Sequence, residues 1–529
     1  MPGGLLQIAA YGAQDIYLTG NPQITFFKVV YRRHTNFALE TIQNTFTGGS
    51  LSFGATNGVT IERSADLISK TYIRVVLRAG TAPAGAQWAW VSNLGHALLK
   101  SIELQIGGQR IDYYTSEWLH MYNELHLKGD QERGYNIMIG NVPALTTLNH
   151  THDAYTLYIP LRFFFDNNVG LALPLISLQY HEVRINVIVE ELKNLIVTTG
   201  FNGIDPVTSL GLSITESSFE CGMVYLDTDE RRRFAQMSHE LLIEQIQISG
   251  PDPIQERNIQ ILTFNNPVKE IVWGVHSGRM ANTSGSYKYL WYDINDVDNM
   301  RLIATKRFVL ACAKYNGSGK LILKNTSYDT NSIEPYDPLS GSLLDLFNSI
   351  KASAVDDDPS LYNVAILGNL LTLEQASTPV SVLFAEFSSR PTNIANDGSA
   401  IYDVVVKMPF NYGLYLDGSV NPLYNGKLIV NGQDRFRLQD AVYFNYLQPY
   451  EHHTRTPSDG INVYSFAIAP EEHQPSGSFN FSRIDTAALQ TFINTNYVTM
   501  LGNDSLCTVY ARSYNVLRIM SGMGGLAYT

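Results

Sequence analysis

Two β-hairpin signals, one in each half of the chain, constrain the fold more than any other feature of the sequence. Residues 101–106 read SIELQI, in which polar and apolar side chains alternate as in a half-buried strand, and Gly107-Gly108 follows as a turn. In the second half, KLIV at 427–430 is followed by Asn431-Gly432, a dipeptide typical of tight hairpins. The sequence therefore predicts antiparallel strands joined by short turns in both halves.

The segments that follow the two hairpins also match. Each hairpin precedes an aromatic, partly helical segment, which in the first half spans residues 115–127 and has Ser116 as its expected N-terminal cap. Each of these segments leads to an aromatic strand, at 155–165 in the first half and at 463–467 in the second. A twofold repeat of this kind indicates duplication of one domain and not a solenoid.

The composition favours β structure with long loops. Charged residues make up 16% of the 529 residues, against about 25% in ordinary domains, while aromatic residues make up 11% and the chain has 40 Gly and 21 Pro. Many short strands without alternating helices point to antiparallel sandwiches, and the jelly roll is one sandwich that protects its sheet edges. The predicted fold class is all-β: two tandem eight-stranded antiparallel jelly rolls with short helical insertions and long surface loops.

We predict that the chain is organised as a leader, a jelly roll, a linker and a second jelly roll that carries a long surface insertion. The corresponding ranges are 1–23, 24–226, 227–240 and 241–529, with the insertion at 325–400. The first jelly roll is expected to open with the strand ITFFKVVYRR at 24–33, whose residues prefer extended backbone. A short helix is expected in the linker, and further strands are predicted at 307–312, 320–324 and 401–408.

The overall charge and the cysteines limit the partners and the compartment. A net charge of −12 at pH 7 argues against direct packing on nucleic acid, which requires a basic stripe. Cys221, Cys312 and Cys507 are widely separated and odd in number, so we predict neither a disulfide framework nor a zinc knuckle, and a reducing compartment is favoured. The start MPGG lacks the basic region of a signal peptide, and no apolar run approaches the ~20 residues of a membrane span.

Two histidine-containing motifs resemble metal sites, and neither meets the requirements of one. His150 and His152 have the H-x-H spacing of a cupin, but Thr156 stands where the following carboxylate is required, so both are interpreted as solvated loop histidines. The run Glu451-His452-His453 contains potential zinc ligands, but adjacent residues on a strand point to opposite faces and cannot all converge. No metal ligand is predicted.

Other motifs with catalytic or cofactor associations also fail. The acidic run Asp356–Asp358 lacks the ligand spacing and turn glycine of a calcium loop. Gly317–Lys320 hints at a phosphate loop, but Lys314 and Leu321 replace the glycine and the hydroxyl residue that the pattern requires. There is no G-x-S-x-G, and no cysteine lies in a nucleophile context. We therefore predict no catalytic residue, no cofactor and no enzymatic activity.

Two basic clusters are candidates for electrostatic contacts. Arg231–Arg233 are expected to pair with the carboxylates of residues 227–230 within one or two helical turns. Arg32, Arg33 and His34 end the predicted first strand. Two interpretations of this second cluster stay open: contact with a neighbouring subunit or minor protein during assembly, or simple solvent exposure.

Five segments resemble the major capsid proteins of nucleocytoplasmic large DNA viruses of the algal and amoebal type. They are GAQDIYLTGNPQITFFKVVYRRHTNF (12–37), GGQRIDYYTSEWL (107–119), GLALPLISLQYHEVRI (170–185), YSFAIAPEEHQPSGSFNFSRID (464–485) and MSGMGGLAY (520–528). Together they span nearly the whole chain. The one departure is the region 325–400, which is longer than in the shorter members of the family.

The resemblance implies a structural role in a virion. It implies a homotrimer with a nearly hexagonal outline, and capsomers that tile an icosahedral shell over an internal membrane. The implied partners are the chain itself, neighbouring capsomers, minor capsid proteins at the capsomer base and, through the N-terminal side, the internal viral membrane. Direct contact with nucleic acid is not expected. The protein is expected in the virion capsid, assembled in the host cytoplasm.

Two other functions fit a jelly roll. A carbohydrate-binding, lectin-like surface protein is suggested by aromatic residues in a predicted loop region, namely Tyr287, Tyr289, Trp291 and Tyr292. A cupin-type metalloenzyme is the third hypothesis, and it rests on His150 and His152 alone.

Overall fold

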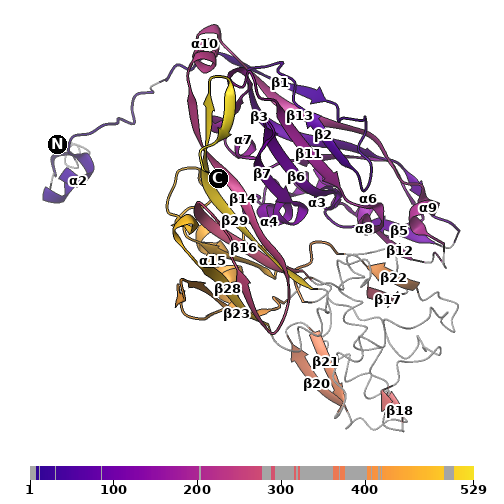
Figure 1. The fold of residues 1–529 in the computed structure, drawn as a ribbon. Coiled ribbons are helices and arrows are strands. Elements are labelled where there is room, and N and C mark those ends of the chain that lie inside the picture. Colours follow the sequence, from indigo (N-terminus) through magenta and orange to yellow (C-terminus); the bar gives the residue numbers. More distant parts are fainter. Residues whose placement is uncertain are drawn as a thin grey trace.

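The computed structural model describes residues 8–10, 12–29, 31–84, 86–199, 201, 204–276, 287–291, 315–316, 320–321, 362–367, 370–375, 402–406, 408–414, 418, 420–493 and 505–528. Within these ranges the chain consists mainly of antiparallel strands. The strands of each half form their own pair of facing sheets (Figure 1).

The first half contains two sheets whose inner faces share one apolar core. The first sheet has the order β1-β13-β3-β10, with β9 also paired to β3: β1 (Phe37–Asn44), β13 (Ile214–Leu226), β3 (Leu67–Leu77), β10 (Leu173–Pro174) and β9 (Tyr155–Pro160). The second sheet has the order β2-β11-β6-β7: β2 (Thr56–Thr60), β11 (Val183–Val189), β6 (Leu99–Ile106) and β7 (Gln109–Thr115). In β11 and β3 buried and more exposed residues alternate, as expected of strands with one face on the core.

The second half also contains two sheets. One has the order β14-β29-β16-β26, with β27 paired to β16 and β30 to β29: β14 (His239–Pro253), β29 (Leu506–Met520), β16 (Pro267–His276), β26 (Ile461–Ser465), β27 (Phe479–Asn480) and β30 (Met523–Leu526). The other has the order β15-β28-β23-β24, with β25 paired to β23: β15 (Arg257–Ile261), β28 (Ala487–Ile493), β23 (Leu423–Val430), β24 (Gln433–Asp434) and β25 (Gln439–Asp440).

Both halves connect their strands in the same order. In the first half the sheet strands, taken along the chain, are β1, β2, β3, β6, β7, β9, β11 and β13; in the second half they are β14, β15, β16, β23, β24, β26, β28 and β29. Numbered one to eight in each half, the strands lie in the order 1-8-3-6 in one sheet and 2-7-4-5 in the other. This is the arrangement of an eight-stranded jelly roll. The predicted all-β fold of two tandem jelly rolls is confirmed.

The predicted internal repeat corresponds to equivalent strands. The strands before the two hairpin turns, β6 and β23, are both fourth in order, and the aromatic strands β9 and β26 are both sixth. Both turns have two residues, since Ile106 pairs with Gln109 and Val430 with Gln433. All four turn residues have positive φ, which asparagine and glycine adopt at low cost.

Within its described part the chain also forms short helices and minor strands in addition to the sixteen strands of the two jelly rolls. The helices are η1 (Ala13–Asp15), α2 (Ile16–Thr19), α3 (Leu94–Leu98), α4 (Ser116–His126), α5 (Glu132–Met138), α6 (Pro143–Thr146), α7 (Phe164–Asn167), η2 (Val169–Leu171), η3 (Leu175–Ser177), α8 (Leu192–Leu195), α9 (Pro206–Leu210), α10 (Thr228–Gln236), η6 (Tyr443–Leu447), α15 (Gln448–His452) and η7 (Phe481–Arg483). The minor strands are β4 (Gly80–Thr81), β5 (Gln87–Trp90), β8 (Thr151–His152), β12 (Ile196–Thr199), β17 (Tyr287–Trp291), β18 (Tyr315–Asn316), β19 (Lys320–Leu321), β20 (Tyr362–Leu367), β21 (Leu370–Gln375) and β22 (Tyr402–Val406). The helix predicted between the two halves is present as α10.

One small sheet joins the two halves. β5 and β12 come from the first half, and β12 pairs with β22 of the second half, which in turn pairs with β17. The strand predicted at 401–408 is therefore present, and part of the one at 320–324 is present as β19. The strand predicted at 307–312 lies outside the described residues, as does most of the region 325–400 except the hairpin of β20 and β21.

Two local predictions are wrong. The segment 24–33 forms no strand at its described residues, and the first jelly roll begins with β1 at Phe37. The β preference of such residues requires a neighbouring strand, and this segment has none within the described chain. The strand predicted at 155–165 ends at Pro160, and a helical turn follows because the Asp166 carboxylate accepts a hydrogen bond from the Phe163 amide.

A single sheet separates the two apolar cores. On β16, Val272 belongs to the core that includes the first jelly roll, whereas Ile271 and Trp273 belong to the core of the second. On β29, Tyr510 and its neighbour Val509 divide in the same way. The sheet β14-β29-β16-β26 is thus a layer buried on both faces, and Figure 1 shows it between the first jelly roll and the strands β23 and β28.

Candidate functional site

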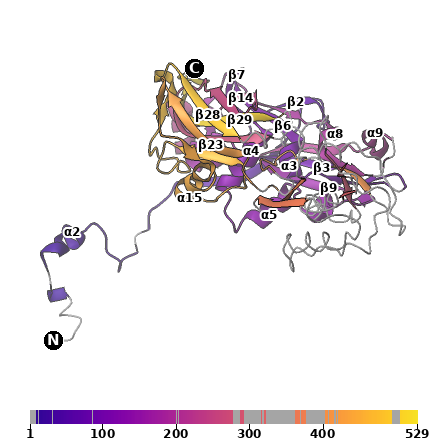
Figure 2. The same ribbon diagram turned by 90° about the horizontal axis from the view of Figure 1, so that it is seen from below.

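The N-terminal arm, defined here as residues 8–36, leaves the body of the molecule and runs away from it (Figures 1 and 2). No described side chain of the arm belongs to either apolar core. Its apolar side chains are exposed instead, with Phe26 and Phe27 at 87% and 97%. Ile24, Val29 and Tyr31 are also exposed. Several large apolar side chains exposed on one segment are a common sign of an interaction site.

The three residues predicted to make assembly contacts lie at the root of this arm. Arg32, Arg33 and His34 are exposed, and they precede β1 where the sequence had predicted the end of a strand. The His34 ring lies edge-on to Phe37, with ring centres 6.2 Å apart. Within the described part of the chain neither arginine forms an ion pair. The structure therefore leaves both cations available to a partner without identifying one.

The first strand continues the exposed surface of the arm. β1 pairs with β13 on one side and forms the edge of its sheet on the other. Phe37 and Leu39 on this strand are 53% and 67% exposed. An uncovered edge strand presents backbone donors and acceptors to any second chain. The arm and this edge together form a candidate assembly surface.

The basic cluster on α10 has a structural role. The Arg231 Nε donates to the Asp66 carboxylate at 3.0 Å, and the same carboxylate accepts from the Leu226 amide at 2.9 Å. The predicted pairing of Arg231 with acids of its own helix is thus wrong. The helix geometry aims this side chain at the first jelly roll, which ties α10 to the residue preceding β3.

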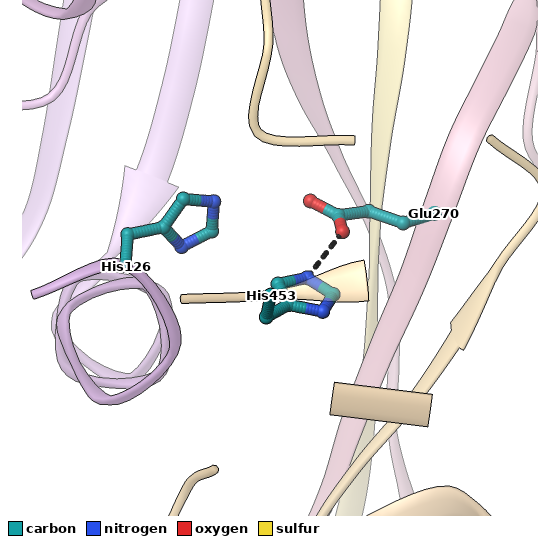
Figure 3. A group of neighbouring side chains, drawn as sticks. All are labelled: His126, Glu270 and His453. Atoms are coloured by element: carbon teal, nitrogen blue, oxygen red, sulfur yellow. Dashed lines mark hydrogen bonds and ion pairs between the residues drawn. The ribbon is translucent and has the colours of Figure 1, made fainter. Parts of the chain in front are cut away.

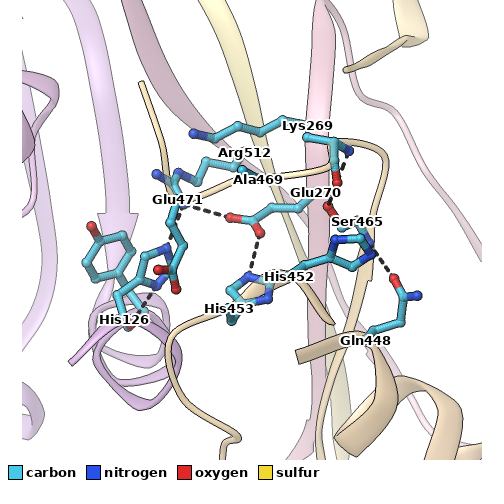
Figure 4. A network of polar contacts seen from close by, with 12 residues as sticks. His126, Lys269, Glu270, Gln448, His452, His453, Ser465, Ala469, Glu471 and Arg512 are labelled. Atoms are coloured by element: carbon cyan, nitrogen blue, oxygen red, sulfur yellow. Dashed lines mark hydrogen bonds and ion pairs between the residues drawn. The ribbon is translucent and has the colours of Figure 1, made fainter. Parts of the chain in front are cut away.

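A second candidate site is a buried charge cluster where α4 of the first jelly roll meets the shared sheet (Figure 4). The Arg512 guanidinium donates from Nη1 to Glu270 at 2.8 Å and from Nη2 to Glu244 at 2.8 Å. Lys269 also donates to Glu244. A β-bulge between Val268 and Glu270 lets Lys269 and Glu270 both reach the cluster.

Two histidines complete the cluster (Figure 3). His453 Nε2 donates to Glu270 at 2.8 Å, and Arg512 Nη1 donates to His126 Nε2 at 2.8 Å. The other nitrogen of His126, Nδ1, donates to the Tyr122 carbonyl at 2.9 Å. His126 is therefore neutral, with its proton on Nδ1 and its lone pair directed at Arg512.

Burial and neighbouring charges shift the pKa values of the cluster. Burial alone would raise the pKa of Glu270, but Arg512 and His453 hold it well below its ordinary value. Burial, with a further contribution from Arg512, lowers the pKa of Lys269 to about 8. For His126, burial and then Arg512 lower the pKa well below its ordinary value. The two carboxylates, Glu244 and Glu270, thus face two cations, Lys269 and Arg512.

The geometry of this cluster resembles a metal site, but its chemistry does not favour one. Nitrogen and oxygen atoms of His126, Glu270 and His453 lie within 4.8 Å of one another, and such a donor set can bind zinc. However, Arg512 already donates to two of these three groups. A divalent cation would have to displace a guanidinium that Glu244 also holds. The arginine therefore provides the positive charge that a metal would supply.

The cluster could not have been recognised from sequence. Glu451 and His452 end helix α15, so the strand assumed for Glu451-His452-His453 is wrong. The two histidines nevertheless diverge, since His453 enters the cluster while His452 Nδ1 bonds the Ile468 carbonyl at 2.9 Å. The partners His126, Glu270 and Arg512 are remote in sequence and lie in no recognisable motif. The sequence offered only a weak signal, namely an acidic and a basic residue on strands whose other inward-facing residues form the core.

The histidines of the H-x-H motif differ in environment. His152 is buried, and its two ring nitrogens lie 2.8 Å from the carbonyl oxygens of Ala144 and Trp88. The interpretation of His152 as a solvated loop histidine is therefore wrong, whereas His150 is exposed as predicted. Because both nitrogens of His152 face carbonyl oxygens, the residue presents no lone pair to a metal.

Taken together, the repeated strand order, the shared sheet and the exposed arm define a double jelly-roll protein. Comparison with known families agrees. The description "Major capsid protein N-terminus" matches residues 25–227, and "Large eukaryotic DNA virus major capsid protein" matches residues 230–342 and 358–525. The chain therefore belongs to the family of major capsid proteins of large eukaryotic DNA viruses.

Individual relatives support this assignment along the whole chain. The major capsid protein of Phaeocystis pouchetii virus is 38% identical and capsid protein 1 of Acanthamoeba polyphaga mimivirus is 37% identical, each alignment covering 100% of both chains. Among solved structures, the PBCV-1 virus capsid matches with a TM-score of 0.62 and 28% identity over 96% of this chain and 100% of the other. All three of these relatives are named as capsid proteins or as a virus capsid.

Two further observations concern the alternatives. The aromatic side chains that suggested carbohydrate binding, at Tyr287, Tyr289, Trp291 and Tyr292, lie outside the described side chains, and none of the relatives named above supports a lectin. No helix in the described part of the chain is both long enough and apolar enough to cross a bilayer.

Proposed function

We propose that the chain is a structural subunit that forms homotrimers, and that these trimers tile an icosahedral shell over an internal membrane. The supporting observation is the repeat of one strand order in two jelly rolls that share a buried sheet. Threefold rotation of such a unit gives a nearly hexagonal outline, because each subunit contributes two similar sandwiches. Closed rotational symmetry also stops growth at a defined number of copies.

The N-terminal arm is proposed to face the base of the capsomer. Its exposed aromatic residues and the exposed cations Arg32 and Arg33 suit a contact with a minor capsid protein, a neighbouring capsomer or the membrane beneath the shell. His34, beside Phe37, belongs to the same surface. A chain with a net charge of −12 is not suited to direct contact with the genome.

The proposed location is the virion capsid, after assembly in the host cytoplasm, and the proposed role is structural and not catalytic. Light scattering on the purified full-length chain at micromolar concentration tests the oligomeric state. A mass of three subunits is expected. A stable monomer under these conditions would refute trimerisation. Electron micrographs of particles containing the chain would then test the tiling.

A further inference from the structure

His126 links the first jelly roll to the second at the charge cluster. It lies at the end of α4, and its ring stacks on Tyr122 of the same helix with centres 3.9 Å apart. Its other contacts come from the second half of the chain: Arg512 of β29 at 2.8 Å and the His453 ring at 5.6 Å between centres. Figures 3 and 4 show these side chains converging from the two sides of the junction.

The contact requires a neutral imidazole. His126 Nδ1–H is engaged by the Tyr122 carbonyl, so only the Nε2 lone pair can accept from Arg512. A second proton on His126 would place an N–H against the N–H of the guanidinium. Arg512 is held in this position, because Glu244 and Glu270 accept its other hydrogen bonds. Protonation would therefore break the bond and set two cations against each other.

The remaining charged groups around His126 do not offset this cost. From β16 come Glu270 and Lys269, from β14 comes Glu244, and from the segment after α15 comes His453. Glu471 and His473 line the adjoining pocket, and the Glu471 carboxylate accepts hydrogen bonds from Thr454. Glu270 attracts a proton on His126, but this carboxylate is already shared between Arg512 and His453. Because Arg512 already lies against His126, a proton added to His126 places a second buried positive charge beside the first, which is unfavourable.

Protons have a route to the cluster. A pocket of about 150 Å³ borders it, lined by Tyr122, Phe164, Asn167, Asn168, Leu171, Glu244, Glu471, His473 and Arg512. Asn167 is exposed, so the pocket reaches the surface. The pocket thus brings solvent to the side of Arg512 and Glu244, one contact away from His126.

We infer that the bond between Arg512 and His126 is an acid-sensitive lock between the two jelly rolls. At neutral pH it holds α4 against the shared sheet. In acid His126 takes up a proton, the bond to Arg512 is lost and the junction opens more often. If the proposed shell function holds, the same step loosens the subunit within a capsid that enters an acidic compartment, but the lock itself is a property of the single chain.

The sign of the pH dependence follows from the neutral state of His126 in the fold. Its folded pKa is lowered, so between the ordinary value of 6.5 and the lower folded value the open state binds the additional proton. Stability of the junction is full above pH 6.5 and is lost as the pH falls below it. One proton changes the opening equilibrium by about tenfold per pH unit in that window.

Hydrogen exchange of the full-length chain tests the lock. Exchange is measured at about pH 7.5 and about pH 5.5 and corrected for the intrinsic rates. The wild-type chain is compared with His126→Gln, whose amide oxygen accepts from Arg512 without titrating. His150→Gln, at an exposed histidine outside the arm and the cluster, is the matched control. We expect protection in α4 and β16 to fall about tenfold in the wild type and in His150→Gln, and to stay level in His126→Gln.

Two outcomes overturn the inference. In the first, His126→Gln loses protection in acid as much as the wild type does. If His126→Gln does not fold, the wild type alone tests the inference. The second overturning outcome is then that protection in α4 and β16 falls in acid no more than protection in β3 and β13, which would show that the junction has no acid sensitivity of its own. A chelator in parallel samples distinguishes a bound metal: a loss of protection on chelation at neutral pH would contradict the assignment of Arg512 as the cation.

Discussion

Val272 and Trp273 are adjacent on β16, yet their side chains belong to different apolar cores. Alternation along a strand places successive residues on opposite faces, and here both faces are covered. The sheet that carries these residues therefore contributes side chains to both apolar cores. A chain built in this way should behave as one mechanical unit, with the relative placement of its sandwiches set by packing and not by a linker.

The shared sheet predicts that the two jelly rolls unfold together. Trp273 is fully buried, and Trp273→Ala is expected to cost about 3–5 kcal/mol, because large aromatic truncations in cores leave a cavity. Calorimetry should show one transition in the wild type, shifted as a whole in the variant. Ile259→Ala on the neighbouring sheet, where the side chain is 54% exposed, should change the stability by less than about 0.5 kcal/mol. Two transitions, of which Trp273→Ala moves only one, would contradict this coupling.

Arg512 and Arg518 offer a matched pair on β29. Each bonds a glutamate of β14, at Glu244 and Glu240 respectively, but Arg512 is buried whereas the Arg518 side chain is 51% exposed. Arg512→Met is expected to destabilise the fold by about 3–5 kcal/mol, because two buried carboxylates lose their shared cation. Arg518→Met should cost about 1 kcal/mol or less. Urea denaturation of both variants measures the difference, and equal effects would show that the cluster is not the buried network described above.

We expect the fold to be destabilised when one carboxylate oxygen of Asp166 is replaced by an amide nitrogen. Its carboxylate accepts from the Thr71 amide at 2.6 Å, from the Thr71 hydroxyl at 2.9 Å and from the Phe163 amide at 3.0 Å. Asp166→Asn turns one acceptor into a donor that faces a backbone N–H, so we expect a loss of about 1–3 kcal/mol. Thermal denaturation checks this value against Asp153→Asn, at an exposed position, which should leave the melting temperature unchanged.

The two hairpins correctly predicted antiparallel strands joined by tight turns in both halves, because alternation and turn residues are local signals. Ile106 and Val430 precede two-residue turns whose backbone conformation glycine and asparagine favour, and the structure has both turns. The start of the first jelly roll was predicted too early, since residues 24–33 have the composition of a strand but no partner in the described chain. Composition indicates that a segment can form a strand, but the strand forms only where a neighbouring strand pairs with it.

The charge cluster, in contrast to the hairpins, could not be predicted from the sequence. His126, Glu270 and Arg512 meet only because α4 packs on the shared sheet, and no local spacing encodes that meeting. His453 belongs to the run Glu451-His452-His453, whose two histidines point to different partners. Contacts between remote segments require the three-dimensional structure, whereas hairpins do not.

We predict that changes in the N-terminal arm impair assembly without affecting folding. Deletion of residues 1–23 should leave trimers intact and impair shell assembly, because the described part of this segment contributes nothing to either apolar core. Phe27→Ser should act in the same direction without changing the melting temperature, since the side chain is 97% exposed. As the matched control, Phe219→Ser, at a fully buried phenylalanine of β13, should instead reduce the melting temperature strongly.

Light scattering and electron microscopy of the same preparations distinguish the outcomes of this deletion. Trimers without shells are expected for the deletion and for Phe27→Ser. Loss of the trimer itself would place the arm at the contact between subunits of one capsomer, and normal shells would show that the exposed aromatic residues have no partner there. Replacing Arg32 and Arg33 by glutamate then separates the charge of the arm from its apolar surface. If charge guides the contact, the reversal should slow assembly most at low ionic strength, because salt screens exposed charges.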